Sequence, residues 1–100
     1  MEVKELQEKA NEIVLGIDEK IGIEHDKETT LMHLVEEVGE VSRQILNPKL
    51  RNEKTDIKNL SEEIADVVLL ISKLAYDYGI DLETAVKTKI KKLKQRHSLK

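Results

Sequence analysis

Two acidic motifs of the same form occur in the middle of the chain. The segment EEVGE spans residues 36–40, and the segment EEIAD spans residues 62–66. In a helix, residues three positions apart lie about 60° apart on the same side. Glu37 and Glu40 would therefore form one pair of neighbouring carboxylates, and Glu63 and Asp66 would form a second pair.

The second motif lies in the most apolar helix that the sequence predicts. Residues such as Ile64, Val67 and Leu70 cover most of its circumference, which is typical of a helix central to a bundle. A carboxylate in such an apolar helix needs a partner of opposite charge. The neighbour of Asp66 on the same side, one turn earlier, is Glu63, which is another acid. Converging carboxylates raise each other's pKa unless a cation lies between them, and Mg²⁺ prefers oxygen ligands. The pattern predicts a divalent cation site, with an ordinary solvated acidic face as the alternative.

The composition and the periodicity predict an all-α fold that forms one domain over residues 1–100. The chain is 39% hydrophobic and 37% charged, with one proline and no phenylalanine or tryptophan. Apolar residues at helical spacing predict four helices, at about residues 3–21, 31–46, 60–78 and 82–97. A core without large rings is small, so a self-associated form is expected.

Local signals set the expected helix ends. The second helix would start at Thr29 or Thr30 and would stop at Asn47-Pro48, because a residue before proline avoids helical geometry. The third would start at Asn59 or Ser61, and the fourth at Asp81.

Composition also excludes several function classes. The absence of cysteine excludes disulfides and thiolate metal sites. The segment MEVKELQEKANEIV is not a secretory signal, and no apolar run approaches the roughly 20 residues that span a bilayer. We therefore expect a cytoplasmic protein with no membrane partner. No nucleic-acid partner is expected either, because the net charge is −3 and aromatic residues do not alternate with the basic ones.

The two motifs in order resemble a known family. LVEEVGEV, a polar spacer and then EEIADVVLLI are similar to the MazG-like all-α nucleotide pyrophosphohydrolase superfamily, in which E-E-x-x-E precedes E-x-x-D. The motifs are separated by 22 residues, and the likeness continues through LAYDYGIDLETAV to cover about residues 31–96. The resemblance implies a four-helix MazG-like bundle that assembles as a homodimer or homotetramer.

The resemblance also implies an activity and its residues. Glu37, Glu40, Glu63 and Asp66 would be ligands of Mg²⁺, for which Mn²⁺ could substitute, and Glu36 would orient or deprotonate water. The implied reaction converts a nucleoside triphosphate and water to the monophosphate and pyrophosphate, as in the removal of non-standard or surplus nucleotides. A bound metal ion and a neighbouring carboxylate suit this hydrolysis, which needs no covalent nucleophile.

The basic C-terminal segment has two interpretations. Lys89 and Arg96 resemble basic residues on the family's last helix and would bind substrate phosphates. Alternatively, the cations near this helix end offset its dipole and stay solvated. The chain departs from the family at Leu93 and Ser98, where relatives often have asparagine and proline, so the family's contacts at those two positions do not transfer.

Two histidines and one connecting stretch lie near the acidic motifs in the sequence. His33 lies four residues before Glu37 and is interpreted as a helix-surface residue rather than a ligand. His25 falls in the connection between the first two helices. The stretch 47–59 carries Arg51 and three lysines, and a solvated linker is favoured over a lid that approaches phosphate.

Three other functions stay open at this point. Phosphoribosyl-ATP pyrophosphohydrolase shares the fold and the carboxylates, but the segment GIDLETAV is more MazG-like. A non-enzymatic helical interaction module would carry the same acids as surface charge. A di-iron bundle is not favoured, because neither motif has the Glu-x-x-His pairs of that design.

Overall fold

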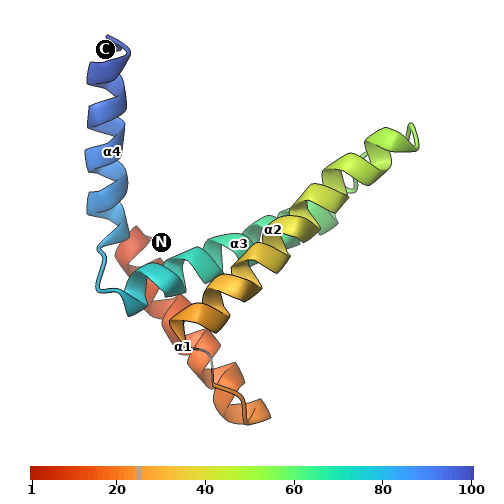
Figure 1. The fold of residues 1–100 in the computed structure, drawn as a ribbon, viewed down its shortest axis with the longest axis horizontal. Coiled ribbons are helices and arrows are strands. Elements are labelled where there is room, and N and C mark those ends of the chain that lie inside the picture. The colour runs from red at the N-terminus through yellow and green to blue at the C-terminus, as the bar shows by residue number, and fades with distance from the viewer. Residues whose placement is uncertain (25) are drawn as a thin grey trace.

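Four helices make up the fold seen in a computed structural model, which describes residues 1–24 and 26–100. His25 lies outside the described residues. No strand occurs among the residues described, which confirms the all-α class. None of the described helices is both long enough and apolar enough to cross a bilayer. The helices are α1 (Val3–Ile21), α2 (Lys27–Leu50), α3 (Ile57–Asp77) and α4 (Leu82–Arg96) (Figure 1).

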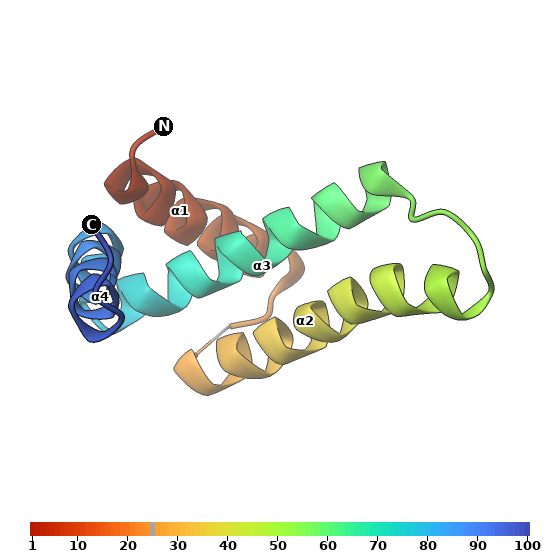
Figure 2. The same cartoon turned by 90° about the horizontal axis from the view of Figure 1, so that it is seen from above.

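The helices α2 and α3 form the antiparallel pair on which the rest of the fold is arranged. They run side by side, and α1 packs across the C-terminal half of α3 (Figures 1 and 2). The fourth helix contacts only α1 and α3 within the described part of the chain and then diverges from the pair. Helix α3 thus contacts every other helix, in agreement with its apolar circumference.

The second and third helices begin earlier than predicted, because aspartates cap them. Asp26 accepts a hydrogen bond from the Thr29 amide at 2.8 Å, so α2 starts before the expected Thr29 or Thr30 cap. Asp56 accepts one from the Asn59 amide at 3.2 Å, so α3 starts before Asn59 or Ser61. Each aspartate satisfies an amide that would otherwise lack a partner at the helix terminus.

The expected end of the second helix at Asn47-Pro48 was wrong. Pro48 lies inside the last turn of α2, which continues to Leu50. Proline lacks the N–H that would bond to the Gln44 carbonyl, and its ring crowds that carbonyl. Only Lys49 and Leu50 follow Pro48 in the helix, so α2 ends soon after it. The amides of Arg51 and Glu53 then donate to the carbonyls of Asn47 and Pro48 at 3.1 and 2.7 Å and close the helix end.

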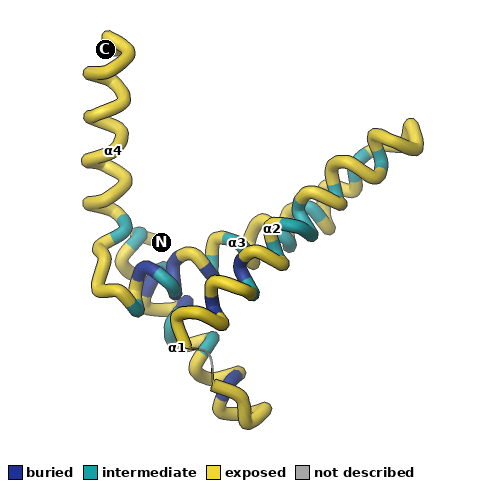
Figure 3. Tube along the Cα trace, viewed as in Figure 1, coloured by how far each residue is buried: buried dark blue, intermediate teal, exposed yellow. Residues whose placement is uncertain are grey.

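The core of a single chain is small. Its buried apolar side chains, which gather where α1 crosses the α2–α3 pair (Figure 3), are Ala10, Leu34, Leu70 and Ala75. The accessible surface is 7897 Å², whereas a compact monomer of this mass exposes about 5,800 Å². The radius of gyration is 16.3 Å, against about 13 Å for a compact domain of this length. One chain therefore leaves much apolar surface uncovered.

Buried polar side chains hold α1 in place. Lys73 of α3 is 4% exposed, and its ammonium donates to Asp77 at 2.6 Å and to Asn11 of α1 at 2.9 Å. The Gln7 amide donates to the Ile80 carbonyl at 2.8 Å and accepts from the Leu82 amide at 3.0 Å. These contacts fix α1 against α3 and against the start of α4, where apolar burial is limited.

The Lys73 network gives a stability prediction. We expect Lys73→Met to lower the free energy of unfolding by about 3 kcal/mol, because Asp77 then stays largely buried without its cation. Lys9→Met is the matched control, because Lys9 pairs with Glu5 in an exposed position, and such pairs contribute about 1 kcal/mol at most. Urea unfolding of both variants measures the difference. Equal losses would mean that the buried network does not stabilise the fold.

Candidate metal centre

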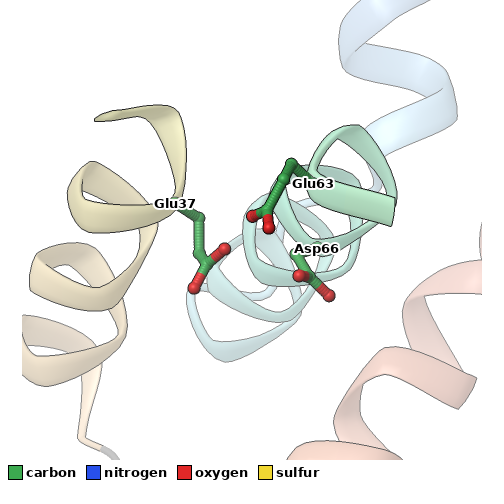
Figure 4. Close-up of side chains that lie close together, drawn as sticks. All are labelled: Glu37, Glu63 and Asp66. Atoms are coloured by element: carbon green, nitrogen blue, oxygen red, sulfur yellow. The ribbon is translucent and has the colours of Figure 1, made fainter. Parts of the chain in front are cut away.

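The packing of α2 against α3 brings three acidic side chains together. Each of Glu37, Glu63 and Asp66 offers a carboxylate oxygen, and these oxygens lie within 4.8 Å of one another. Figure 4 shows Glu37 reaching from α2 toward Glu63 and Asp66 on α3. The i, i+3 spacing of Glu63 and Asp66 places them one turn apart, so both meet the single acid that faces them.

Two acids of the cluster, Glu63 and Asp66, have raised pKa values. A hydrogen bond with Glu37 is the main cause that raises the pKa of Glu63, and burial and the charges of Glu37, Asp66 and Glu40 raise it further. Partial burial is the main cause that raises the pKa of Asp66, followed by the charge of Glu37, while His33 acts in the opposite direction. Without a cation, the cluster therefore retains protons at a higher pH than isolated carboxyls do.

Asp66 is more accessible than its apolar neighbours suggested. The sequence predicted that it would not face water freely, but its side chain is exposed in the single chain, whereas Glu37 and Glu63 are half-buried. The reason is that α1 packs beside Asp66 without covering it. Asp66 instead borders an apolar cavity of about 260 Å³ with Leu69 and Leu70. An accessible carboxylate at a cavity edge can still bind an ion that arrives from solution.

Glu40, the expected fourth ligand, lies at the edge of the cluster. Its carboxylate accepts a hydrogen bond from the guanidinium of Arg43 one turn further along α2, and both side chains are exposed. Its charge nevertheless contributes to the raised pKa of Glu63. Glu40 is therefore close enough to act on the cluster electrostatically, and its role as a ligand stays a prediction.

Two other residues of α2 lie beside the cluster. The Nε2 atom of His33 is 3.3 Å from Glu37 Oε1, so this histidine orients a member of the cluster. The i, i+4 spacing is the sequence signal for this contact, whereas the sequence alone favours a plain surface role for His33. Glu36, the expected general base, is exposed and lines a shallow cavity with Thr29, Met32 and His33. It neighbours the cluster without joining it.

The predicted phosphate contacts lie on a different part of the molecule. Lys89 and Arg96 belong to α4, which has no contact with α2 in the described part of the chain and diverges from the α2–α3 pair (Figures 1 and 2). Within one chain, the structure therefore does not bring these cations to the acids. Their predicted role depends on a second subunit.

The donor set suits a hard divalent cation. Three carboxylate oxygens within 4.8 Å of one another can bind one ion, and Mg²⁺ usually keeps several waters beside one or two carboxylates. Thiolate ligands are excluded because the chain has no cysteine. Cation binding would displace the retained protons and relieve the repulsion among the acids.

Removing one charge separates stability from binding. In metal-free buffer we expect Asp66→Asn to be as stable as wild type at low pH and more stable at neutral pH. The pKa of Asp66 is raised in the folded state, so wild type loses stability as pH rises from about 4 through that raised value. Thermal unfolding at several pH values in a chelator measures this, with Glu12→Gln as a surface control. A variant that is no more stable than wild type at neutral pH would contradict the repulsive cluster.

The comparison with known proteins identifies the family. The sequence matches the MazG nucleotide pyrophosphohydrolase domain over residues 25–99, which includes both acidic motifs and all of α2, α3 and α4. Neither the curated proteins nor the solved structures yield a match. The match confirms the resemblance seen in the motifs and covers most of the chain. The chain belongs to the MazG nucleotide pyrophosphohydrolase family.

Proposed function

We propose that the protein is a divalent-cation-dependent nucleoside triphosphate pyrophosphohydrolase. The observation that carries this proposal is the convergence of Glu37, Glu63 and Asp66 from two helices in a chain of this family. The reaction cleaves the bond between the α and β phosphates with water and releases a nucleoside monophosphate and pyrophosphate. We place it in the cytoplasm, where it would remove non-standard or surplus nucleotides.

Each acidic residue has a role in the proposal. Glu37, Glu63 and Asp66 would hold Mg²⁺, or Mn²⁺ in its place, and Glu40 would join them by turning from Arg43. A bound cation neutralises phosphate charge and lowers the pKa of a coordinated water. His33 keeps Glu37 in position. Glu36, one residue before Glu37, would orient the water or accept its proton.

We further propose that two copies assemble through the back of the α2–α3 pair. At about 100° per residue, Val38 and Ile45 of α2 and Ile64, Val68 and Ile71 of α3 lie about 80° to 160° around their helices from the acids, on the flank and back of the pair. All five are substantially exposed in the single chain. A compact monomer would expose about 2,100 Å² less surface than this chain does, or about 4,200 Å² less for two chains. Obligate dimers bury about 2,000–5,000 Å² in total over both chains. Covering this face leaves the acid cluster open.

The assembly also offers a route for the cations of α4. Lys89 and Arg96 project from a helix that its own chain scarcely covers, and Val86 and Ile90 form an exposed apolar stripe on it. If a partner subunit packs against this stripe, Lys89 and Arg96 would lie near the acid cluster of that partner subunit. The phosphate-binding role of Lys89 and Arg96 is thus part of the dimer or tetramer proposal.

The activity prediction concerns product and metal. Incubation with each nucleoside triphosphate and Mg²⁺ should release pyrophosphate and monophosphate, and a chelator should stop the release. Glu63→Gln should lower the rate by more than about 100-fold, because loss of even a supporting group at a metal site costs about 10–100-fold. Glu12→Gln should keep the wild-type rate. Product identification by chromatography is the measurement.

Other outcomes of the same assay would change the assignment. Orthophosphate as the only product would contradict cleavage between the α and β phosphates. Faster turnover of phosphoribosyl-ATP than of free triphosphates would move the protein to that related activity. No turnover and no Mg²⁺ or Mn²⁺ binding by calorimetry would favour a non-enzymatic interaction module.

The assembly prediction rests on the apolar face. We expect wild type to sediment at two or four times the chain mass of 11.5 kDa, and Val68→Glu to sediment as a monomer. A carboxylate at the centre of an apolar interface would be buried without a partner. Leu50→Glu is the control, because Leu50 is exposed at the end of α2 and outside this face. A monomeric wild type, or a Val68→Glu variant that still associates, would contradict the proposed interface.

A further inference from the structure

The fourth helix extends from the fold although its own chain gives it few contacts. None of the residues of α4 is buried, and within the described part of the chain α4 meets only α1 and α3, near its start (Figures 1 and 2). Val86, Ile90 and Leu93 follow one another at helical spacing and are exposed. Packing within one chain therefore does not fix the direction of α4, so the turn that precedes it must do so.

The turn between α3 and α4 is held in part by its own backbone. The Ile80 amide donates to the Ala75 carbonyl at 2.9 Å, and Gly79, with a φ of 67°, reverses the chain. Asp81 caps α4 with its side chain. The carbonyl of Ile80 and the amide of Leu82 lie on either side of this cap and need partners of their own.

One side chain of α1 supplies both partners. The Gln7 side-chain amide donates to the Ile80 carbonyl at 2.8 Å, and its oxygen accepts from the Leu82 amide at 3.0 Å. Gln7 is 5% exposed and lies one turn before the buried Ala10, on the side of α1 that packs into the fold. An apolar residue at this position would leave two backbone groups shielded from water without partners. The glutamine therefore serves the turn rather than the core.

Two hydrogen bonds from one planar amide fix the direction of α4 relative to α1. A single bond would let the turn rotate about it, whereas bonds to groups two residues apart define an orientation. Because Gln7 is nearly shielded from water, replacing these bonds by bonds to water is costly. The direction of α4 is thus set before the helix meets a partner.

The charge of α4 indicates which partner it meets. Residues 82–100 carry one acid and seven basic residues, whereas residues 1–81 carry 19 acids and 10 basic residues. The C-terminal segment of one copy is therefore complementary in charge to the body of another copy. Within one chain, α4 has no contact with α2 in the part that the structure describes. A second copy matches both the exposed apolar stripe and the charge of α4.

We propose that Gln7 is a positioning residue that presents α4 to a second copy of the chain in one direction. This inference rests on the proposed assembly and explains how α4 is prepared for it. A helix that is already oriented loses less freedom on docking, so the copies associate more tightly than they would through a mobile α4. The same orientation carries Lys89 and Arg96 toward the acids of the second copy.

Spin labels measure the direction of α4. The chain has no cysteine, so Glu12→Cys on α1 and Lys94→Cys on α4 take labels at those positions alone. Distances are read at dilutions at which sedimentation shows single chains. Gln7→Leu should broaden the distribution of distances about twofold or more, since both hydrogen bonds are lost. Gln95→Leu is the matched control, because this exposed glutamine of α4 lies on the side away from the apolar stripe. It should keep the wild-type width.

Sedimentation measures the consequence for assembly. Gln7→Leu should associate about tenfold more weakly than wild type, because α4 then loses its freedom of direction only on docking. Gln95→Leu should associate as wild type does. A wild-type distribution of distances in Gln7→Leu, or wild-type association, would overturn the inference.

Gln7→Glu tests the hydrogen bonds themselves and decides the matter even if Gln7→Leu does not fold. An ionised carboxylate cannot donate to the Ile80 carbonyl, whereas a protonated carboxyl donates to it and still accepts from the Leu82 amide. The charged residues that border the same cavity as Gln7 are Lys4, Glu8 and Asp81. Because burial raises the pKa of the introduced carboxyl, the distribution should be broad at about pH 8 and of wild-type width at about pH 5. A distribution that does not narrow at the lower pH would contradict the proposed role of Gln7.

These outcomes are distinct from a failure of the proposed function. If Gln7→Leu behaves as wild type does, the inference is wrong, and the assembly and activity of wild type still stand. If wild type is monomeric at every concentration, the assembly proposal and this inference fail together. The product assay with nucleoside triphosphates reports on the activity in either case.

Discussion

The mutual repulsion of three carboxylates is the constraint on which the site depends. Glu37, Glu63 and Asp66 are held within 4.8 Å of one another because the helices that carry them pack through residues such as Leu34 and Leu70. A hydrogen bond with Glu37 raises the pKa of Glu63, burial raises that of Asp66, and the neighbouring charges raise both further, so these two acids take up protons at a higher pH than isolated carboxyls do. A divalent cation can replace those protons and bind the carboxylates, which otherwise face one another without a cation between them. Strain of this kind is usual where structure serves binding.

Helical periodicity lets the same two helices serve two purposes. Acids at i and i+3 occupy one side of α2 and α3, while apolar residues such as Val38 and Val68 occupy the opposite side. Neither side intrudes on the other, so the pair can present a polar site to water and an apolar face to another subunit. Buried polar contacts such as that of Lys73 with Asn11 attach α1 without covering either side.

The sequence predicted the parts of this structure that depend on periodicity. The all-α class and the meeting of Glu37 with Glu63 and Asp66 follow from spacing along two adjacent helices. The pairing of Glu40 with Arg43 does not follow from spacing alone. The rotamer of Glu40 decides whether its carboxylate meets Arg43 or the acid cluster, and spacing does not determine the rotamer. The length of α2 was also missed, since Asp26 and Pro48 act on single hydrogen bonds at its ends.

The spacing between α2 and α3 links the two sides of the pair. The distances among the carboxylates are set by how closely these helices approach, but the single chain supplies few buried apolar contacts to fix that approach. Its accessible surface of 7897 Å² shows how much of the packing is left to other contacts. A second copy on the apolar face would hold the helices from behind and keep them from spreading under the repulsion of the acids. Assembly would then stabilise the ion-free cluster and preserve the geometry that a cation needs, so the apolar face and the candidate metal centre would be mechanically coupled although they share no residue.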